Sequence, residues 1–213
     1  MLPPGSSFPA REACATVALT GDRVPVARQV GARYRLQGEE PPRAGRAGLP
    51  HALVSAAEYL PYASDTFDTI VSNEVIEHVH DDRLAMREIV RVLKQGGRAV
   101  IFCPNRWYPF ETHGHFWRGE YHFGNSPLVN YLPDRWRNQL APHVRAYTRR
   151  GLYQLLEDCP AQVVAYRRIY GGYDNIIARL GGVGRVMRDT LHALEGTPLD
   201  TWGLSHFLVI EKI

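Results

Sequence analysis

The stretch SDTFDTIVSNEVIEHVHDDRLAMREIVRVLKQGGRAVIFCPN, residues 64–105, decides the fold. Its polar turn followed by a Phe-x-x-Ile-Val core predicts a strand over 64–73. Apolar residues at helical spacing, with charged residues between them, predict a helix over 74–94 that is broken near residues 80–82. A glycine pair follows the basic last turn of that helix and ends it. The next apolar run, residues 96–105, predicts a further strand.

The flanking sequence predicts more elements of both kinds. Residues 49–56 form a short apolar run after a turn signal, which indicates a buried strand. Downstream, periodicity predicts helices over 149–159 and 176–194 and strands over 161–170 and 205–213. Strands whose apolar runs barely alternate are typical of a sheet that is covered on both faces. The sequence therefore predicts an α/β fold with a doubly wound sheet.

In a doubly wound fold, ligands bind beyond the carboxyl ends of the strands, and Glu74 stands just past the strand predicted over 64–73. Glu74, Glu77 and His78 are spaced i, i+3 and i+4, which on a helix places three side chains on one face. Two carboxylates and an imidazole form a mixed oxygen and nitrogen ligand set for a divalent cation. An imidazole can also act as a general base, because its pKa lies near working pH.

The bulk composition narrows the class of protein. The 213 residues suit one α/β domain with a filled core, and an apolar fraction of 45% is ordinary for a globular chain. The net charge of +3 argues against a nucleic-acid partner, and the arginines between residues 135 and 150 are interpreted as a solvated face. The three cysteines form no CxxC pair. No apolar run approaches the roughly 20 residues of a membrane span and no secretory signal is present, so we expect a cytoplasmic protein without a membrane partner.

Two segments, AEYLPYASDTFDTIVSNEVIEHVHD (57–81) and EIVRVLKQGGRAVIFCPN (88–105), resemble class I S-adenosylmethionine-dependent methyltransferases of the type 11 kind. The resemblance implies a mostly parallel, Rossmann-like sheet in which residues 161–170 and 205–213 are the sixth and the reversed seventh strand. It also implies S-adenosylmethionine as the cofactor and a small-molecule acceptor that is methylated on oxygen, with nitrogen and carbon as the alternatives.

The same resemblance implies one domain over residues 1–213. Its divergent N-terminal part is 1–48, an aromatic lid spans 105–147, and a helical insertion spans 171–200. We expect the lid and the insertion to select the acceptor, because long segments of this kind are often binding loops.

The N-terminal part departs from the family pattern. The family carries a glycine-rich loop after its first strand, where missing side chains let the backbone approach the cofactor. The alignment implies that Gly21 closes this loop and Glu39 holds the ribose hydroxyls, with Ala57 and Asn73 as further cofactor contacts. Larger residues stand where the earlier glycines belong. Three explanations stay open: a divergent loop that still binds, a relative that does not bind, or a shifted reading frame in this part.

A similar ExxEH helix occurs in metal-dependent methyltransferases that act on neighbouring hydroxyls, where a later histidine completes the site. This resemblance implies a divalent metal such as Mg²⁺ held by Glu74, Glu77, His78 and His113, with His115 as a second candidate for the last ligand. It implies that His78, His113 and Glu74 carry catalysis, with a histidine as general base. The competing interpretation is that Glu74 lines the cofactor pocket, while Glu77 and His78 have only structural roles in packing or in capping a helix.

Two other classes of function compete with an active methyltransferase. One is a methyltransferase-like module that has lost cofactor binding and works through partners, which the missing glycines favour. The other is a nicotinamide-dependent Rossmann enzyme, which needs a GxGxxG loop after the first strand that this sequence lacks. The sequence predicts neither the identity of the acceptor nor the oligomeric state.

Overall fold

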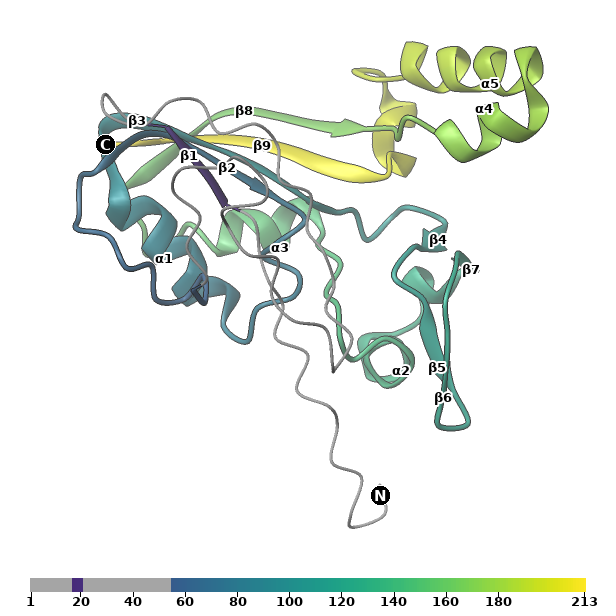
Figure 1. The fold of residues 1–213 in the computed structure, drawn as a ribbon, viewed down its shortest axis with the longest axis horizontal. Helices are drawn as coiled ribbons and strands as arrows, with labels where there is room; N and C mark the ends of the chain where they lie inside the picture. The colour runs from purple at the N-terminus through teal and green to yellow at the C-terminus, as the bar shows by residue number, and fades with distance from the viewer. Residues whose placement is uncertain (1–16, 21–54) are drawn as a thin grey trace, which may run out of the picture.

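The computed structural model describes residues 17–20 and 55–213, in which strands and helices follow one another as expected of an α/β protein (Figure 1). In chain order the elements are β1 (Val17–Thr20), β2 (Phe67–Asn73), α1 (Asp82–Val92), β3 (Leu93–Pro104), β4 (Phe110–Glu111), β5 (His115–Trp117), β6 (Glu120–His122), β7 (Ser126–Pro127), η2 (Val129–Tyr131), α2 (Asp134–Leu140), α3 (Arg149–Gln154), β8 (Ala161–Ile169), α4 (Asp174–Leu180), α5 (Gly182–Ala193), η3 (Pro198–Trp202) and β9 (Ser205–Lys212). The two strands predicted near the C-terminus are confirmed as β8 and β9, and the helix predicted before them is confirmed in a shorter form as α3.

Five of the described strands form one mixed sheet in the order β1-β2-β3-β9-β8. Strands β2 and β3 run parallel, with Ile70 opposite Ala99, and α1 connects them. Strand β9 runs antiparallel to both β3 and β8, so the α/β class and the reversed last strand are confirmed. Strand β1 pairs antiparallel with β2, so parallel pairing among the described strands is confined to β2 and β3. The strand predicted over 49–56 lies almost wholly outside the described residues.

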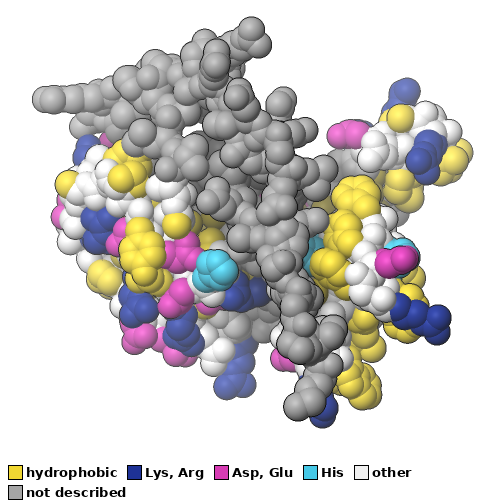
Figure 2. Space-filling model, turned by 60° about the horizontal axis from the view of Figure 1, so that its bottom comes forward, with side chains coloured by type: hydrophobic (Ala, Val, Ile, Leu, Met, Phe, Trp, Pro, Cys, Tyr) yellow, Lys and Arg dark blue, Asp and Glu magenta, His cyan; other side chains and the backbone are white. Residues whose placement is uncertain are grey.

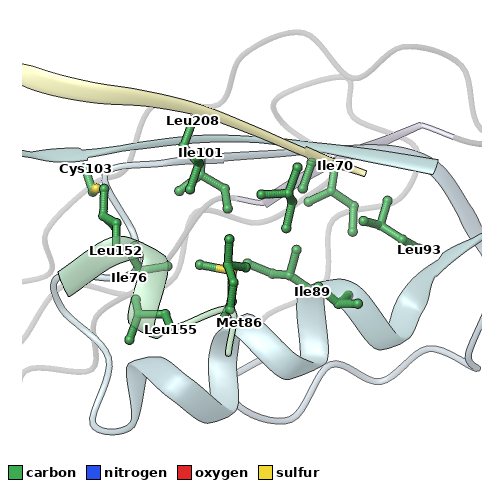
Figure 3. Close-up of a cluster of buried hydrophobic side chains, with 14 of the residues drawn as sticks. Ile70, Ile76, Met86, Ile89, Leu93, Ile101, Cys103, Leu152, Leu155 and Leu208 are labelled. Carbon is green, nitrogen blue, oxygen red and sulfur yellow. The ribbon is translucent and has the colours of Figure 1, made fainter. Parts of the chain in front are cut away.

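Helices α1 and α3 lie on the same face of the sheet and bury the main hydrophobic core against it (Figures 1 and 3). Ile70 and Ile101 of the parallel pair and Leu208 of β9 meet Met86 and Ile89 of α1, and all five side chains are fully buried. Each such side chain contributes roughly 1.5–3 kcal/mol by leaving water. This core fixes where β2 and β3 end, and therefore where the residues that follow them lie.

Helix α1 begins at Asp82 and not at residue 74 as predicted. The side chain of Asp81 caps it by accepting a hydrogen bond from the backbone of the first turn at 2.9 Å. Just before the cap, a carboxylate oxygen of buried Glu58 accepts from the backbone N–H groups of His80 at 2.8 Å and Asp81 at 3.3 Å. The predicted break is confirmed, but the segment before it consists of turns, because a side chain from elsewhere in the chain binds its backbone.

The helix predicted over 176–194 is two helices, α4 and α5, which meet at Gly181. Gly181 has a φ of 55° and a ψ of −120°, a conformation that residues with a Cβ rarely adopt. Its N–H ends α4 by donating to the carbonyl of Ile177 at 2.8 Å. Together the two helices project beyond the end of β8 (Figure 1). None of the described helices is both long and apolar enough to cross a membrane.

Candidate active site

A turn segment, residues 74–81, follows β2 at the carboxyl end of the parallel pair, and residues far along the chain hold it in place. The Tyr147 hydroxyl donates to the carbonyl of Ile76 at 2.8 Å. The backbone N–H of Arg145 donates to the carbonyl of Glu77 at 3.0 Å. These contacts replace the hydrogen bonds of a helix and determine which way the side chains of the segment point.

Three side chains that can bind a metal or move a proton lie together beside this segment: Glu77, His78 and His113, called here the Glu-His-His cluster. Their ligand atoms lie within 4.8 Å of one another. Nε2 of His78 is 3.6 Å from Oε1 of Glu77, and the two imidazole centroids are 5.1 Å apart. Glu77 is 1% exposed, and among the described residues no N–H or hydroxyl group donates to its carboxylate oxygens, whose near neighbour is the carboxyl group of Glu74. A buried carboxylate of this kind costs stability, so the arrangement is better suited to binding than to packing.

Burial sets the protonation of the Glu-His-His cluster. It raises the pKa of Glu77, and the nearby carboxylate of Glu74 raises it further. Burial also lowers the pKa of His78 to about 4, and the adjacent His113 contributes to the lowering. His78 is therefore a neutral imidazole at neutral pH, with Nδ1 3.3 Å from the carbonyl oxygen of His143. Because Nδ1 donates to that oxygen, the lone pair is on Nε2, the nitrogen nearer Glu77.

His113 reaches the cluster from the loop between β4 and β5. Oε1 of Glu111 accepts from its backbone N–H at 3.0 Å and lies 3.1 Å from its Nδ1. Burial opposes ionisation of Glu111, but the hydrogen bonds from His113 and the charge of Arg137 lower the pKa of Glu111 overall. The ring of His143 also donates to the carbonyl of His113, with Nε2 at 3.0 Å.

A cavity of about 250 Å³ opens beside the cluster, at the carboxyl end of β3. Its polar lining includes Glu74, Glu111 and His113, and its aromatic lining includes Tyr108 and Phe110. A small pocket with a few polar groups and aromatic walls is typical of a site for a small organic molecule. A small molecule bound in this cavity would therefore lie within reach of His113.

Residues 25–101 match a family model that is described as a methyltransferase domain. The matched segment contains β2, the turn segment with Glu77 and His78, α1, and most of β3. This part of the chain is similar to methyltransferase domains. The sequence resemblance to S-adenosylmethionine-dependent methyltransferases is thereby confirmed.

Several curated proteins are similar to this chain. A demethylmenaquinone methyltransferase from Streptomyces avermitilis is 33% identical over 139 residues, which are 61% of this chain and 58% of that protein. Another from Streptomyces griseus is 42% identical over 55 residues, 25% of this chain and 24% of that protein. The chain thus spans at most 58% of the length of these two relatives. A solved S-adenosylmethionine-dependent methyltransferase from Mesorhizobium loti has a TM-score of 0.48 and 13% identity, covering 78% of this chain and 73% of that one.

The Glu-His-His cluster contains three of the four predicted metal ligands. The fourth, Glu74, borders the cavity, and its Oε1 accepts from the Ser205 hydroxyl at 3.0 Å. His115 lies outside the cluster, with Nδ1 2.6 Å from the Ser126 hydroxyl. The helical-face argument for the ExxEH spacing was wrong, because the segment is a turn in which Glu74 has a φ of 52°.

The predicted cofactor contacts are only partly described. Ala57 is buried, and Asn73 is exposed at the carboxyl end of β2. Gly21 and Glu39 lie outside the described residues. Asn73 therefore occupies the strand end at which this fold binds ligands, and the cofactor contacts of all four residues remain predictions.

Sequence reasoning missed four residues of the site: Glu58, Glu111, Arg137 and His143. Arg137 was interpreted as part of a solvated face, yet it is 1% exposed and bonded to Glu111. Its sequence neighbours, Trp136 and Asn138, gave no signal that the Arg137 side chain is buried. Glu111 carried a usable signal, since an acidic residue two positions before a candidate histidine can orient it.

Proposed function

We propose that this chain transfers the methyl group of S-adenosylmethionine to a hydroxyl-bearing small molecule held in the cavity beside the Glu-His-His cluster. The observation that carries the proposal is the position of this cluster. It lies at the carboxyl end of the parallel strands of a methyltransferase domain, next to a cavity that His113 borders. Folds of this class bind their ligands at that edge.

Methylation of a hydroxyl requires that its proton leaves as the oxygen attacks the methyl group in line with the sulfonium. We assign the role of general base to His113, because it borders the cavity and its Nδ1 is bonded to Glu111. His78, with its pKa lowered to about 4, is a weak base and serves better as a neutral ligand. Glu74 at the cavity wall would orient the acceptor hydroxyl by accepting from it.

Glu77, His78 and His113 also fit a divalent metal, with Glu74 as a neighbouring carboxylate. The fit rests on the buried oxygens of Glu77, which find no hydrogen-bond donor in the part of the chain that the structure describes. A bound cation would lower the pKa of an acceptor hydroxyl. One carboxylate and two imidazoles favour Mn²⁺ or another first-row transition metal over Mg²⁺, which prefers oxygen ligands. We therefore propose Mn²⁺ in place of the Mg²⁺ expected from the resemblance.

Gly21, Glu39, Ala57 and Asn73 are retained as the proposed contacts of S-adenosylmethionine. The exposed position of Asn73 at the end of β2 supports this assignment. If the N-terminal part does not bind the cofactor, the alternative of a methyltransferase-like interaction module applies to the chain.

The names of the relatives indicate an aromatic acceptor. Two of them are demethylmenaquinone methyltransferases, and another is described as a ubiquinone/menaquinone biosynthesis C-methyltransferase from Geotalea daltonii. The aromatic walls of the cavity suit an aromatic ring. Hydrophobic side chains also gather on part of the molecular face shown in Figure 2. Deprotonation of a phenol activates both its oxygen and the adjacent ring carbons. We propose a hydroxylated ring as the acceptor, methylated on oxygen, with methylation of ring carbon as the second candidate.

Product analysis with labelled cofactor tests this proposal. The purified chain is incubated with Mn²⁺, CD₃-labelled S-adenosylmethionine and a panel of catechols and hydroquinones. The expected result is S-adenosylhomocysteine together with a product that carries the label on oxygen, located by NMR. A label on ring carbon would establish the second candidate. Bound cofactor without any labelled product would contradict the acceptor class, and absence of cofactor binding would favour the interaction module.

A further inference from the structure

Glu111 is a buried carboxylate at the end of β4, and one of its oxygens contacts a single residue twice. Oε1 accepts from the backbone N–H of His113 at 3.0 Å and lies 3.1 Å from its Nδ1. Glu111 is 2% exposed, and the Thr112 hydroxyl lies 3.4 Å from the same ring nitrogen. Because an ionised carboxylate only accepts hydrogen bonds, this contact places the proton of a neutral His113 on Nδ1 and its lone pair on Nε2.

The other oxygen of Glu111 is held by Arg137, which comes from α2. Nη2 of Arg137 donates to Oε2 at 2.7 Å, and both side chains are 2% exposed. Nη1 donates to the carbonyl of Val144 at 2.7 Å, and Nε donates to Oδ1 of Asn130 at 3.4 Å. Asn130 in turn donates to the carbonyl of Phe110 at 3.0 Å, next to Glu111 in β4. The carboxylate is therefore fixed in both position and orientation.

A buried ion pair of this kind is weak evidence for stability, because desolvation of the two charges offsets their attraction. Its geometry has a clearer consequence for the ring that Glu111 contacts. We infer that Glu111 and Arg137 are positioning residues that set the tautomer of His113 and direct its Nε2 into the Glu-His-His cluster. The inference rests on the proposed function for its purpose, since a directed lone pair serves either a base or a metal ligand.

The tautomer can be measured directly by NMR of the ¹⁵N-histidine-labelled chain at mildly alkaline pH, with His113 assigned from the spectrum of His113→Ala. In the wild type, His113 is expected to be protonated on Nδ1. The Glu111→Gln variant loses the negative charge that holds this proton on Nδ1, so we expect a mixture of both tautomers of His113. We also expect Mn²⁺ affinity to fall by about 10- to 100-fold, as is typical when the partner of a ligand histidine is lost.

Asp200→Asn is the matched control, because it removes another largely buried ion pair, Arg168–Asp200, whose side chains lie 2.7 Å apart. This variant should lose stability but keep the wild-type tautomer and Mn²⁺ affinity. If Glu111→Gln does not fold, Arg137→Lys is measured in its place, since a lysine lacks the planar fork that reaches both Glu111 and Val144.

Protonation of wild-type His113 on Nε2 would overturn the inference, and so would a folded Glu111→Gln or Arg137→Lys with unchanged tautomer and Mn²⁺ affinity. The tautomer is read without cofactor, acceptor or metal. Failure of this inference is therefore distinguishable from failure of the proposed methyl transfer.

Discussion

Replacing His113 with alanine is expected to lower kcat/KM for methyl transfer by a factor of about 10² to 10⁴, the usual contribution of a positioned general base. The variant loses the Nε2 lone pair of His113, which serves either as the proposed base at the cavity wall or as a ligand of the Glu-His-His cluster. The initial rate of S-adenosylhomocysteine formation under saturating cofactor measures the effect.

His115→Ala is the matched control for this experiment, because His115 lies two positions further along. Its Nδ1 is 2.6 Å from the Ser126 hydroxyl, and the residue is outside the cluster. We expect kcat/KM close to that of the wild type. Equal losses in the two variants would contradict a role for the His113 ring, since they would trace the effect to the segment 113–115 as a whole.

Glu77→Gln is expected to stabilise the metal-free protein by about 1–3 kcal/mol at alkaline pH, because a neutral amide replaces a buried, ionised carboxylate and burial of a charge costs more than burial of a neutral polar group. The sign follows from the raised pKa of Glu77. The folded state holds this proton more tightly than the unfolded state, so the contribution of Glu77 to stability is favourable at low pH. This favourable contribution is lost as the pH rises from the ordinary pKa of a carboxyl group through the raised pKa of Glu77. The advantage of the variant should therefore grow from acidic to alkaline pH.

Urea unfolding across this pH range, with and without Mn²⁺, measures both parts of the prediction. Mn²⁺ at 100 times its Kd should stabilise the wild type by about 2.7 kcal/mol and the variant little. Glu58→Gln is the matched control, because Glu58 is also buried but accepts from the backbone of His80 at 2.8 Å. That variant should lose stability. A Glu77→Gln protein that is less stable than the wild type at every pH, or that Mn²⁺ stabilises equally, would contradict the cluster as a cation site.

Local periodicity was sufficient to predict β2, β3 and β9, because several of the side chains that define these strands are buried. It also predicted β8, although the side chains of that strand are half-buried or exposed. It was not sufficient for the start of α1. The spacing of Glu74, Glu77 and His78 fits a helix, but Glu58, which is 22 residues before His80, binds the backbone there. A tertiary contact of this kind overrides local propensity.

In the candidate site, too, some residues could be predicted from the sequence and others depend on tertiary contacts. The ExxEH group and His113 were selected by resemblance, and the structure brings three of these residues together although the helical argument for them does not hold. Glu111 and Arg137 are 26 residues apart in a segment without periodicity, so nothing local connects them. Glu111 and Arg137 meet because η2, α2 and β4 pack together, and no local sequence pattern predicts that packing.

Calorimetric titration of the purified chain with S-adenosylmethionine, with and without Mn²⁺, tests the central claim most directly. The account predicts saturable binding with a Kd on the order of micromolar, within the usual range for enzyme substrates. Such binding would show that the N-terminal part, with its unusual loop, still holds the cofactor. A folded sample that binds no cofactor in either condition would contradict the methyltransferase assignment for this chain.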